Sequence, residues 1–198
     1  MSSEIELKFS LSDKFSPSDV FNRLSLASPI REITMKSTYF DTEDNLLGKI
    51  QASLRHRMEN ETSVFTIKTP FGSKGALTQR GEWQVESEDL TEALPLLLSS
   101  GAPKEVLDLA NAPLITVAEF EFMRKCALVT TDSFSAELCV DIGYLSPDGV
   151  KKTPLREVEI ELIEGDISAL CKFGEDLKEK FSLIPQSLSK LVRARNLK

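Results

Sequence analysis

The stretch EIELKF, residues 4–9, alternates strictly between charged and apolar side chains. Successive side chains of a β-strand point to opposite faces, so Glu4, Glu6 and Lys8 share one face and the three apolar residues share the other. Taken alone, the segment predicts a half-buried strand whose charged face lies in water. The remaining sequence has to decide between this interpretation and the opposite one, in which the charged face points inward.

Composition narrows the class of protein. The chain has 198 residues, of which 41% are hydrophobic, and we expect a single domain over residues 1–198 with a sizeable core. The net charge of −7 argues against nucleic acid as the main partner, because nucleic-acid-binding domains usually carry a basic excess. Overall charge still allows a local basic pocket that binds a small anion.

The cysteines and the apolar segments indicate a compartment. Cys126, Cys139 and Cys171 are odd in number and contain no CxxC motif, which argues against a disulfide framework or a zinc site and fits a reducing environment. The acidic start of the chain lacks the apolar core of a signal peptide, and no run of about 18 apolar residues predicts a membrane span. We therefore expect a soluble, cytoplasmic protein with no membrane partner; the sequence does not indicate its oligomeric state.

Strand-like alternation recurs along the chain. The segments with this period are 4–9, 52–58, 63–68, 79–86, 117–125, 134–141 and 156–163, with an extended piece near 35–40. Helical patterns occupy 15–27, 90–99, 104–110 and the stretch that starts at Gly165. TPFGSKG (69–75) and SPDG (146–149) have the composition of turns or loops. Sequential strands with helices between groups favour an α+β fold with an antiparallel sheet.

Charged residues keep to one face of each predicted strand. The polar faces carry Glu4, Glu6 and Lys8; Arg55 and Arg57; Lys68; Arg80 and Glu82; Glu137 and Asp141; and Glu157, Glu159 and Glu161. For any single strand, a solvated face is the ordinary interpretation. Across the strands, however, carboxylates and cations are segregated, as if the carboxylates held a hard divalent cation and the cations held phosphate. If the sheet closes into a barrel, these faces line its lumen and the helices cover the apolar outer wall.

The order of the motifs resembles the CYTH superfamily, the triphosphate tunnel metalloenzymes. EIELKF is similar to the ExExK signature of that family. Matching segments follow in order: TYFDT (38–42), LRHR (54–57), TIK (66–68), QRGEW (79–83), MRK (123–125), VDIG (140–143), EVEIEL (157–162) and SLSK (187–190). The resemblance covers nearly the whole chain and is closest to the bacterial inorganic triphosphatases. It implies a closed antiparallel eight-stranded β-barrel, the tunnel, with helices packed outside.

The resemblance also implies roles for individual residues. The candidates for holding Mg²⁺ or Mn²⁺ are Glu4, Glu6, Asp141, Glu157, Glu159 and Glu161. The candidates for contacting phosphate oxygens are Lys8, Arg55, Arg57, Lys68, Arg80, Arg124 and Lys190. Lys8, Arg57 and Glu82 are the catalytic candidates, and Glu82 and Asp141 would orient basic residues or bind a second metal. The pattern departs from the family at Cys126, where a basic residue is common.

Four other residues are better explained by structure than by chemistry. The parity of His56 and Trp83 sends both side chains outward, with Trp83 packed under a helix. Tyr39 is expected to pack, and Asp41 is expected to serve a turn.

The leading expectation is metal-dependent hydrolysis of inorganic triphosphate to pyrophosphate and phosphate. Water is the expected nucleophile, activated either by the metal or by a lysine with a lowered pKa. Within the family, thiamine triphosphatase and class IV adenylyl cyclase are alternatives. Both would need contacts to an organic group, for which an aromatic platform is common. A non-catalytic polyphosphate-binding module and a plain structural β domain are the remaining alternatives, although glutamates without a metal would weaken anion binding.

Overall fold

The structure is a computed structural model that describes residues 3–147, 149–150 and 152–197. Its elements are β1 (Ser3–Ser10), α1 (Pro17–Phe21), β2 (Arg31–Thr42), α2 (Leu46–Lys49), β3 (Ser53–Glu59), β4 (Thr62–Lys74), β5 (Leu77–Glu86), α3 (Leu90–Ser99), α4 (Lys104–Ala110), β6 (Leu114–Thr130), β7 (Phe134–Ser146), β8 (Thr153–Gly165), α5 (Ile167–Phe181), β9 (Ile184–Pro185) and α6 (Lys190–Arg195). Among the helices so described, none has the length and apolar character needed to cross a membrane.

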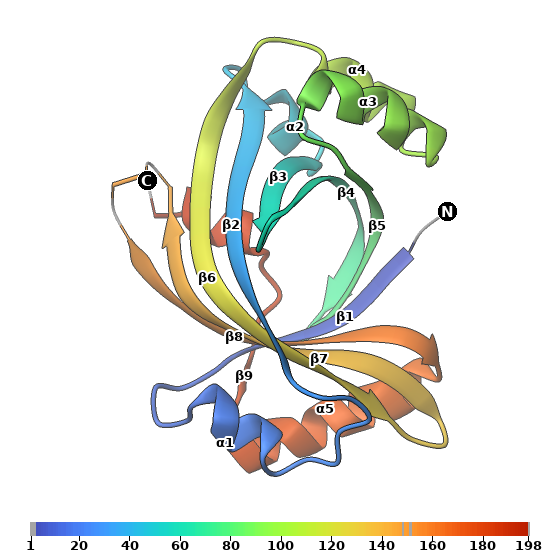
Figure 1. Ribbon diagram of the computed structural model, residues 1–198, viewed down its shortest axis with the longest axis vertical. Coiled ribbons are helices and arrows are strands. Elements are labelled where there is room, and N and C mark those ends of the chain that lie inside the picture. Colours follow the sequence, from blue (N-terminus) through green and yellow to red (C-terminus); the bar gives the residue numbers. More distant parts are fainter. Residues whose placement is uncertain (1–2, 148, 151, 198) are drawn as a thin grey trace.

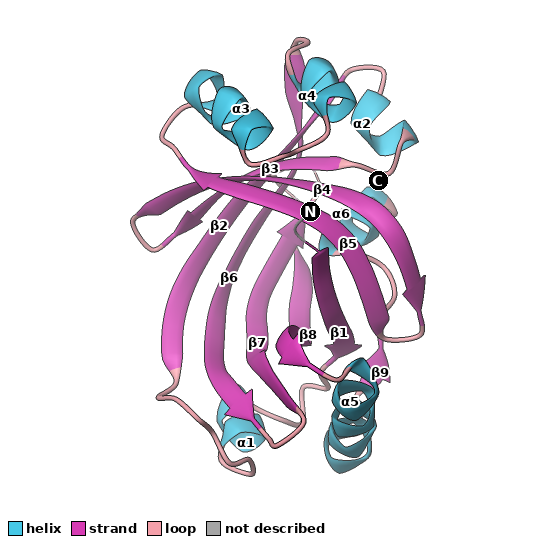
Figure 2. Cartoon of the chain, turned by 90° about the vertical axis from the view of Figure 1, so that its right-hand side faces the viewer, coloured by secondary structure: helices cyan, strands magenta, loops and turns pink. Residues whose placement is uncertain are grey.

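The sheet closes on itself. Its strands follow the order β5-β4-β3-β2-β6-β7-β8-β1, and β1 also pairs with β5, so that eight antiparallel strands form a barrel (Figures 1 and 2). The short strand β9 pairs with Phe9 and Ser10 of β1, on the edge of β1 opposite to β8. The prediction of an α+β fold built on a closed eight-stranded antiparallel barrel is therefore confirmed.

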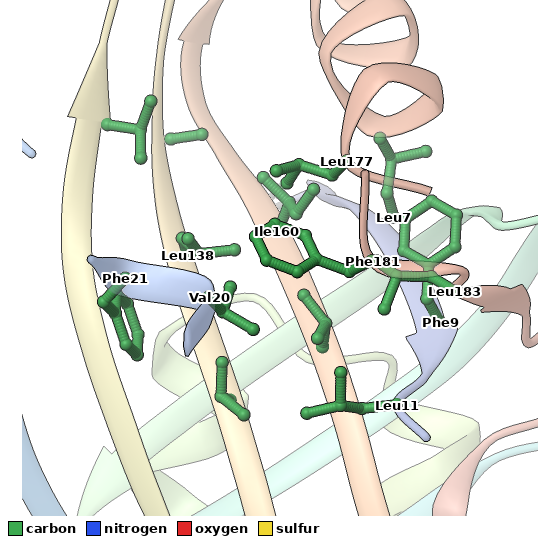
Figure 3. Packing of buried hydrophobic residues seen from close by; sticks show 14 of the residues in the cluster. Leu7, Phe9, Leu11, Val20, Phe21, Leu138, Ile160, Leu177, Phe181 and Leu183 are labelled. Atoms are coloured by element: carbon green, nitrogen blue, oxygen red, sulfur yellow. The ribbon is translucent and has the colours of Figure 1, made fainter. Parts of the chain in front are cut away.

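The apolar face of EIELKF forms part of the outer wall. Leu7 and Phe9 are buried in a cluster beneath α5, where Leu177 and Phe181 pack against them (Figure 3). Gly174 allows this helix to approach the strand, because a Cβ at that position would lie 2.5 Å from Leu7 Cδ1. The strand's apolar side therefore faces a helix, and its charged side is left to face the lumen.

Two further clusters complete the packing. The first lies outside β3, β4 and β5 under α3 and α4, and Trp83 belongs to it as predicted. The second joins Leu191 and Ala194 of α6 to side chains of β2 and β6, among them Tyr39 and Phe122. Tyr39 and Phe122 also line the central cavity, so α6, a helix that the sequence did not predict, packs against the inner face of the sheet.

Three predicted boundaries were wrong. Strand β4 continues through the predicted loop 69–74 because it stays paired with β5, with a register shift between Pro70 and Gly72. Proline is tolerated at such irregularities because one ladder hydrogen bond is already lost there. The helix predicted over 15–27 is shortened to α1, which ends at Phe21, and β2 starts at Arg31, earlier than predicted. The predicted turn 146–149 includes Asp148, which lies outside the described residues.

Candidate functional site

The barrel encloses a cavity of about 650 Å³ that is lined mainly by charged side chains. The phosphate-binding candidates all lie in its wall: Lys8, Arg55, Arg57, Lys68, Arg80, Arg124 and Lys190. Glu4, Glu6, Glu82, Glu159 and Glu161 line it as well. The structure therefore brings together, from six strands and α6, residues that the sequence could relate only by parity or resemblance.

The charged side of β1 faces this cavity. Lys8 is only 2% exposed, and its ammonium donates to a carboxylate oxygen of Glu6 at 3.0 Å. Arg80 of the neighbouring strand donates to the same oxygen of Glu6 at 3.1 Å. A buried ammonium requires partners of this kind, because charge is costly to remove from water. The ordinary interpretation of EIELKF, with its charges in solvent, is therefore wrong.

One group of ion pairs lies around Lys68. Its ammonium is 2.8 Å from Glu4 and 3.0 Å from Glu82, and Arg55 is 3.9 Å from Glu82. Burial disfavours the charge on Lys68, but Glu82 and Glu4 outweigh burial and raise the pKa of the ammonium above its ordinary value. Burial likewise disfavours the Glu82 carboxylate, yet Lys68 and Arg55 lower its pKa to about 2. Lys68 and Glu82 are therefore both charged at neutral pH.

A second group surrounds Lys190. Its ammonium contacts three carboxylates, at 3.0 Å from Asp141, 2.6 Å from Glu159 and in close contact with Glu157. Arg124 donates two hydrogen bonds to Asp141, at 2.8 and 2.7 Å, in the forked geometry that suits a carboxylate. Despite burial, Glu157 and Glu159 raise the pKa of Lys190. The α6 helix thus anchors one end of the cavity through charge.

Arg57 is the lining arginine whose charge the surroundings disfavour. Burial and the positive charges of Arg55 and Arg124 together lower its pKa to about 10. The Nε atoms of Arg55 and Arg57 are buried without a hydrogen-bond partner among the described residues. The Nε atoms of Arg156 and Arg193 are unpaired in the same way, but only Arg55 and Arg57 line the cavity, where their donors are in reach of an anion.

Glu161 stands out among the carboxylates. It lies directly opposite Glu6 in the β1–β8 ladder. Although Glu161 is solvent-exposed as a residue, desolvation of its carboxylate by the cavity wall and the negative charges of Glu4 and Glu82 together raise its pKa to about 7. Within the described part of the chain, no lysine or arginine lies within ion-pair distance of Glu161, whereas Glu4 and Glu6 are each paired. The local excess of negative charge marks this end of the cavity as a place for a cation.

Two groups of side chains have the spacing of metal ligands, with donor atoms within 4.8 Å of one another. One is Asp141, Glu157 and Glu159, and the other is Cys126, Glu137 and Cys139. Asp141 and Glu157 are fully buried behind the cavity wall. In the first group the ammonium of Lys190 touches all three carboxylates.

Every lysine and arginine that lines the cavity is paired with a carboxylate. Besides the pairs already described, Arg57 contacts Glu59 and Arg31 contacts Glu137. Arg31 and Glu59 were missed as site residues because they lie outside the predicted strands. The strand with Arg31 was predicted to start near residue 35, and the strand with Glu59 was predicted to end at residue 58. Arg193 was also missed; it contacts Glu157 from α6. The sequence did offer a signal for Arg193. Ser189 is a typical helix N-cap, and residues 190 and 193 of a helix that begins there lie on the same face.

The expected structural residues behave as predicted. His56 lies outside the cavity wall, stacks on Phe65 at 4.6 Å and shares a hydrogen bond with Ser63. Burial lowers the pKa of His56. Asp41 accepts hydrogen bonds from three backbone N–H groups at the turn into α2, and it also receives Arg195 from α6.

This arrangement of strands and charges has counterparts among known proteins. The family model of the CYTH domain matches residues 2–194 of the chain. The chain belongs to the CYTH family. The resemblance of its motif order to that family is therefore confirmed.

The CYTH chain is related to a protein of Haemophilus influenzae named inorganic triphosphatase. The two are 28% identical over 166 residues, which cover 82% of this chain and 46% of the relative. The chain therefore spans about half the length of the curated relative that it matches.

Solved structures share the fold of the CYTH chain. A Hippeastrum protein, described as a putative adenylyl cyclase with a dominant triphosphatase activity, superposes with a TM-score of 0.71 at 20% identity, covering 98% of this chain and 96% of that one. A protein of Pyrococcus horikoshii gives 0.61 at 18% identity, covering 98% and 99%. A putative adenylate cyclase of Bacillus halodurans gives 0.59 at 20% identity, covering 96% of each chain. At these identities the likeness concerns the fold.

Proposed function

We propose that this CYTH protein hydrolyses inorganic triphosphate to pyrophosphate and phosphate, with Mg²⁺ or Mn²⁺ as cofactor. The observation that carries the proposal is the convergence of all the phosphate-binding candidates on one cavity. The Haemophilus relative named inorganic triphosphatase and the triphosphatase activity stated for the Hippeastrum protein support it.

The cations would position the substrate and stabilise its charge. Water attacks the terminal phosphorus, the bond from that phosphorus to the bridging oxygen breaks, and pyrophosphate leaves with the electron pair of that bond. Lys8 and Arg57 are assigned to the phosphate oxygens on which charge develops, and Lys68 and Arg55 are held by Glu82 for the same task. Such positioned charges provide most of the catalysis in phosphoryl transfer. Glu82 therefore acts as a positioning residue.

The expected lysine base finds little support. The pKa values of Lys68 and Lys190 are raised because the carboxylates around them outweigh burial. Both side chains are consequently protonated at neutral pH and serve as fixed positive charges. Activation of the attacking water would then be the chemistry that a bound divalent cation supplies.

The carboxylates near Glu161 suit a hard divalent cation, because Mg²⁺ and Mn²⁺ prefer oxygen ligands. We assign the ion to Glu4, Glu6 and Glu161, with Glu159 one step along the same ladder opposite Lys8. When bound, such an ion neutralises charge on substrate oxygens and lowers the pKa of a coordinated water. A cation bound there would offset the negative charges of Glu4 and Glu82 that raise the pKa of Glu161.

Asp141 and Glu157 receive a different assignment from the one that the resemblance implied. With Glu159 they have metal-ligand spacing, but the ammonium of Lys190 already contacts all three carboxylates. A metal there would have to displace Lys190 from all three ligands, whereas among Glu4, Glu6 and Glu161 the last has no lysine or arginine partner in the described part of the chain. We therefore propose that Asp141 and Glu157 hold Arg124 and Lys190 in position for the substrate.

An organic substrate, as in thiamine triphosphatase or adenylyl cyclase, is the second candidate because Tyr39 and Phe122 line the cavity. The rings already have partners, however. Arg124 and Lys190 lie over the ring of Phe122 at 5.9 and 5.5 Å, and Tyr39 packs against Phe120 at 4.9 Å. This favours the inorganic substrate.

The proposal is tested by incubating the purified protein with triphosphate, thiamine triphosphate and ATP, each with Mg²⁺, with Mn²⁺ or with chelator. We expect phosphate release from triphosphate that chelator abolishes and either metal restores. Cyclic AMP as the main product from ATP, or binding of triphosphate without turnover, would overturn the proposed reaction. Full activity after thorough chelation would overturn the metal assignment alone.

A further inference from the structure

Two cysteines face each other across the β6–β7 ladder. Cys126 and Cys139 are direct cross-strand neighbours, and both are buried. Glu137 lies two residues before Cys139 and therefore on the same face of β7. The sulfur atoms and a carboxylate oxygen of Glu137 all lie within 4.8 Å of one another. The strand pairing thus brings together two thiols and a carboxylate that are spread over 126–139 in the sequence.

The Glu137 carboxylate is held in a defined orientation. One of its oxygens accepts a hydrogen bond from the Cys139 thiol at 3.5 Å, and the other contacts Arg31. Arg31 is the residue of β2 that lies opposite Cys126. Carboxylate ligands of metal ions are commonly oriented by a second hydrogen-bond partner in this way.

The cysteines lie on the charged side of the sheet. Arg124, two residues before Cys126, and Glu159, opposite Cys139 on β8, both line the cavity, as do Arg31 and Glu137. Buried cysteines ordinarily pack among apolar side chains, as small hydrophobic residues. An apolar environment does not explain this pair, because all its direct neighbours on the same face except Leu128 are polar or ionic.

We propose that Cys126, Cys139 and Glu137 form a binding site for Zn²⁺ in the tunnel wall, separate from the carboxylates assigned to Mg²⁺ or Mn²⁺. Two sulfur ligands select Zn²⁺ over the hard cations, which prefer oxygen. Three protein ligands leave one tetrahedral position for a water or a phosphate oxygen from the cavity. Binding releases the thiol protons, because thiolate is the ligand form. The absence of a CxxC motif does not exclude such a site, since the strand pairing supplies the proximity.

Metal binding tests this proposal without reference to enzyme activity. The reduced, metal-free protein is dialysed against Zn²⁺ in excess Mg²⁺, and bound metal is measured. We expect one Zn²⁺ per chain, with an affinity at least about tenfold weaker in Cys126→Ser and in Cys139→Ser. Cys171→Ser is the matched control, because Cys171 lies on α5, away from the cavity wall, and should leave Zn²⁺ binding unchanged. No retained Zn²⁺, or equal retention in Cys126→Ser, would overturn the site.

A second measurement on the wild-type protein does not depend on the folding of the variants. X-ray absorption at the zinc edge should show two sulfur neighbours, and Co²⁺ in place of Zn²⁺ should give a sulfur-to-metal charge-transfer band. A zinc spectrum with only nitrogen and oxygen neighbours would overturn the proposal. Failure of triphosphate hydrolysis would leave these measurements unaffected, so the zinc site and the proposed function fail separately.

Discussion

The ammonium of Lys68 on β4 donates to both carboxylate oxygens of Glu4 on β1, at 2.8 Å each. These strands are not neighbours in the sheet, since β5 lies between them. The pair therefore links strands across the interior face, next to the seam at which β1 closes the barrel. A variant that breaks this ion pair can be tested for turnover and for folding separately.

Replacing Lys68 with methionine should lower triphosphate turnover by about 100- to 1,000-fold, the loss typical of removing one stabilising donor. The control is Lys36→Met, because Lys36 lies on the exposed side of β2 and pairs only loosely with Glu121 at 3.8 Å. Steady-state phosphate release and circular dichroism are measured together. Near-normal turnover in a folded Lys68→Met protein would exclude Lys68 from the substrate site.

Glu161→Gln should raise the Mg²⁺ concentration needed for half-maximal activity by at least about tenfold, because it removes a proposed ligand and the local excess of negative charge. Glu164→Gln, further along β8 and exposed, is the matched control. The direct readout is the affinity for Mn²⁺, followed by its paramagnetic resonance signal. Unchanged Mn²⁺ affinity in Glu161→Gln would remove Glu161 from the metal site.

Acid should destabilise the protein partly through Glu82. Its pKa is lowered to about 2 in the folded protein, so the unfolded chain binds its proton first as the pH falls below about 4.5. The stabilisation is complete above that pH, and about 2 kcal/mol of it should be lost between pH 6 and pH 3. Urea unfolding at both pH values is compared for wild type, Glu82→Gln and the exposed control Glu86→Gln. An equal acid-induced loss in wild type and Glu82→Gln would contradict the assignment.

Lys190→Met should reduce the free energy of unfolding by about 3 to 5 kcal/mol, because Asp141, Glu157 and Glu159 lose the ammonium that contacts all of them. Since these carboxylates have metal-ligand spacing, Mg²⁺ should raise the melting temperature of the variant more than that of wild type. Thermal melts with and without Mg²⁺ check both statements. A variant as stable as wild type in chelator would show that the contacts of Lys190 contribute little.

Parity in the sequence predicted much of the site, because a two-residue period fixes which side chains share a face. It placed Glu4 and Lys8 together and opposed them to Leu7 correctly. Which face points inward depended on comparison between strands, and closure of the barrel came from the family resemblance. The match of the helices 90–99 and 104–110 to their predicted bounds shows how far local patterns reach.

What the sequence could not predict depends on pairing between distant segments. Arg31 precedes the predicted start of its strand, although its side chain lines the cavity. The position of α6 against the inner face follows from contacts of Lys190 and Arg193 with buried carboxylates, and no local pattern in six residues encodes that. Cys126 and Cys139 became a pair only once the register of β6 and β7 was known.

The carboxylate partners of the lining cations act as built-in counterions with which every incoming anion must compete. A single phosphate displaces few of them and gains little, whereas a triphosphate engages several cations at once. Selection would then depend on the number of linked phosphates. After hydrolysis, each shorter product would contact fewer cations and would compete less well with the glutamates for them. We expect inhibition constants to rise steeply from triphosphate analogues to pyrophosphate to phosphate, and similar constants for all three would show that the internal counterions do not discriminate. The glutamates would thus make affinity depend on the number of linked phosphates, in addition to balancing charge.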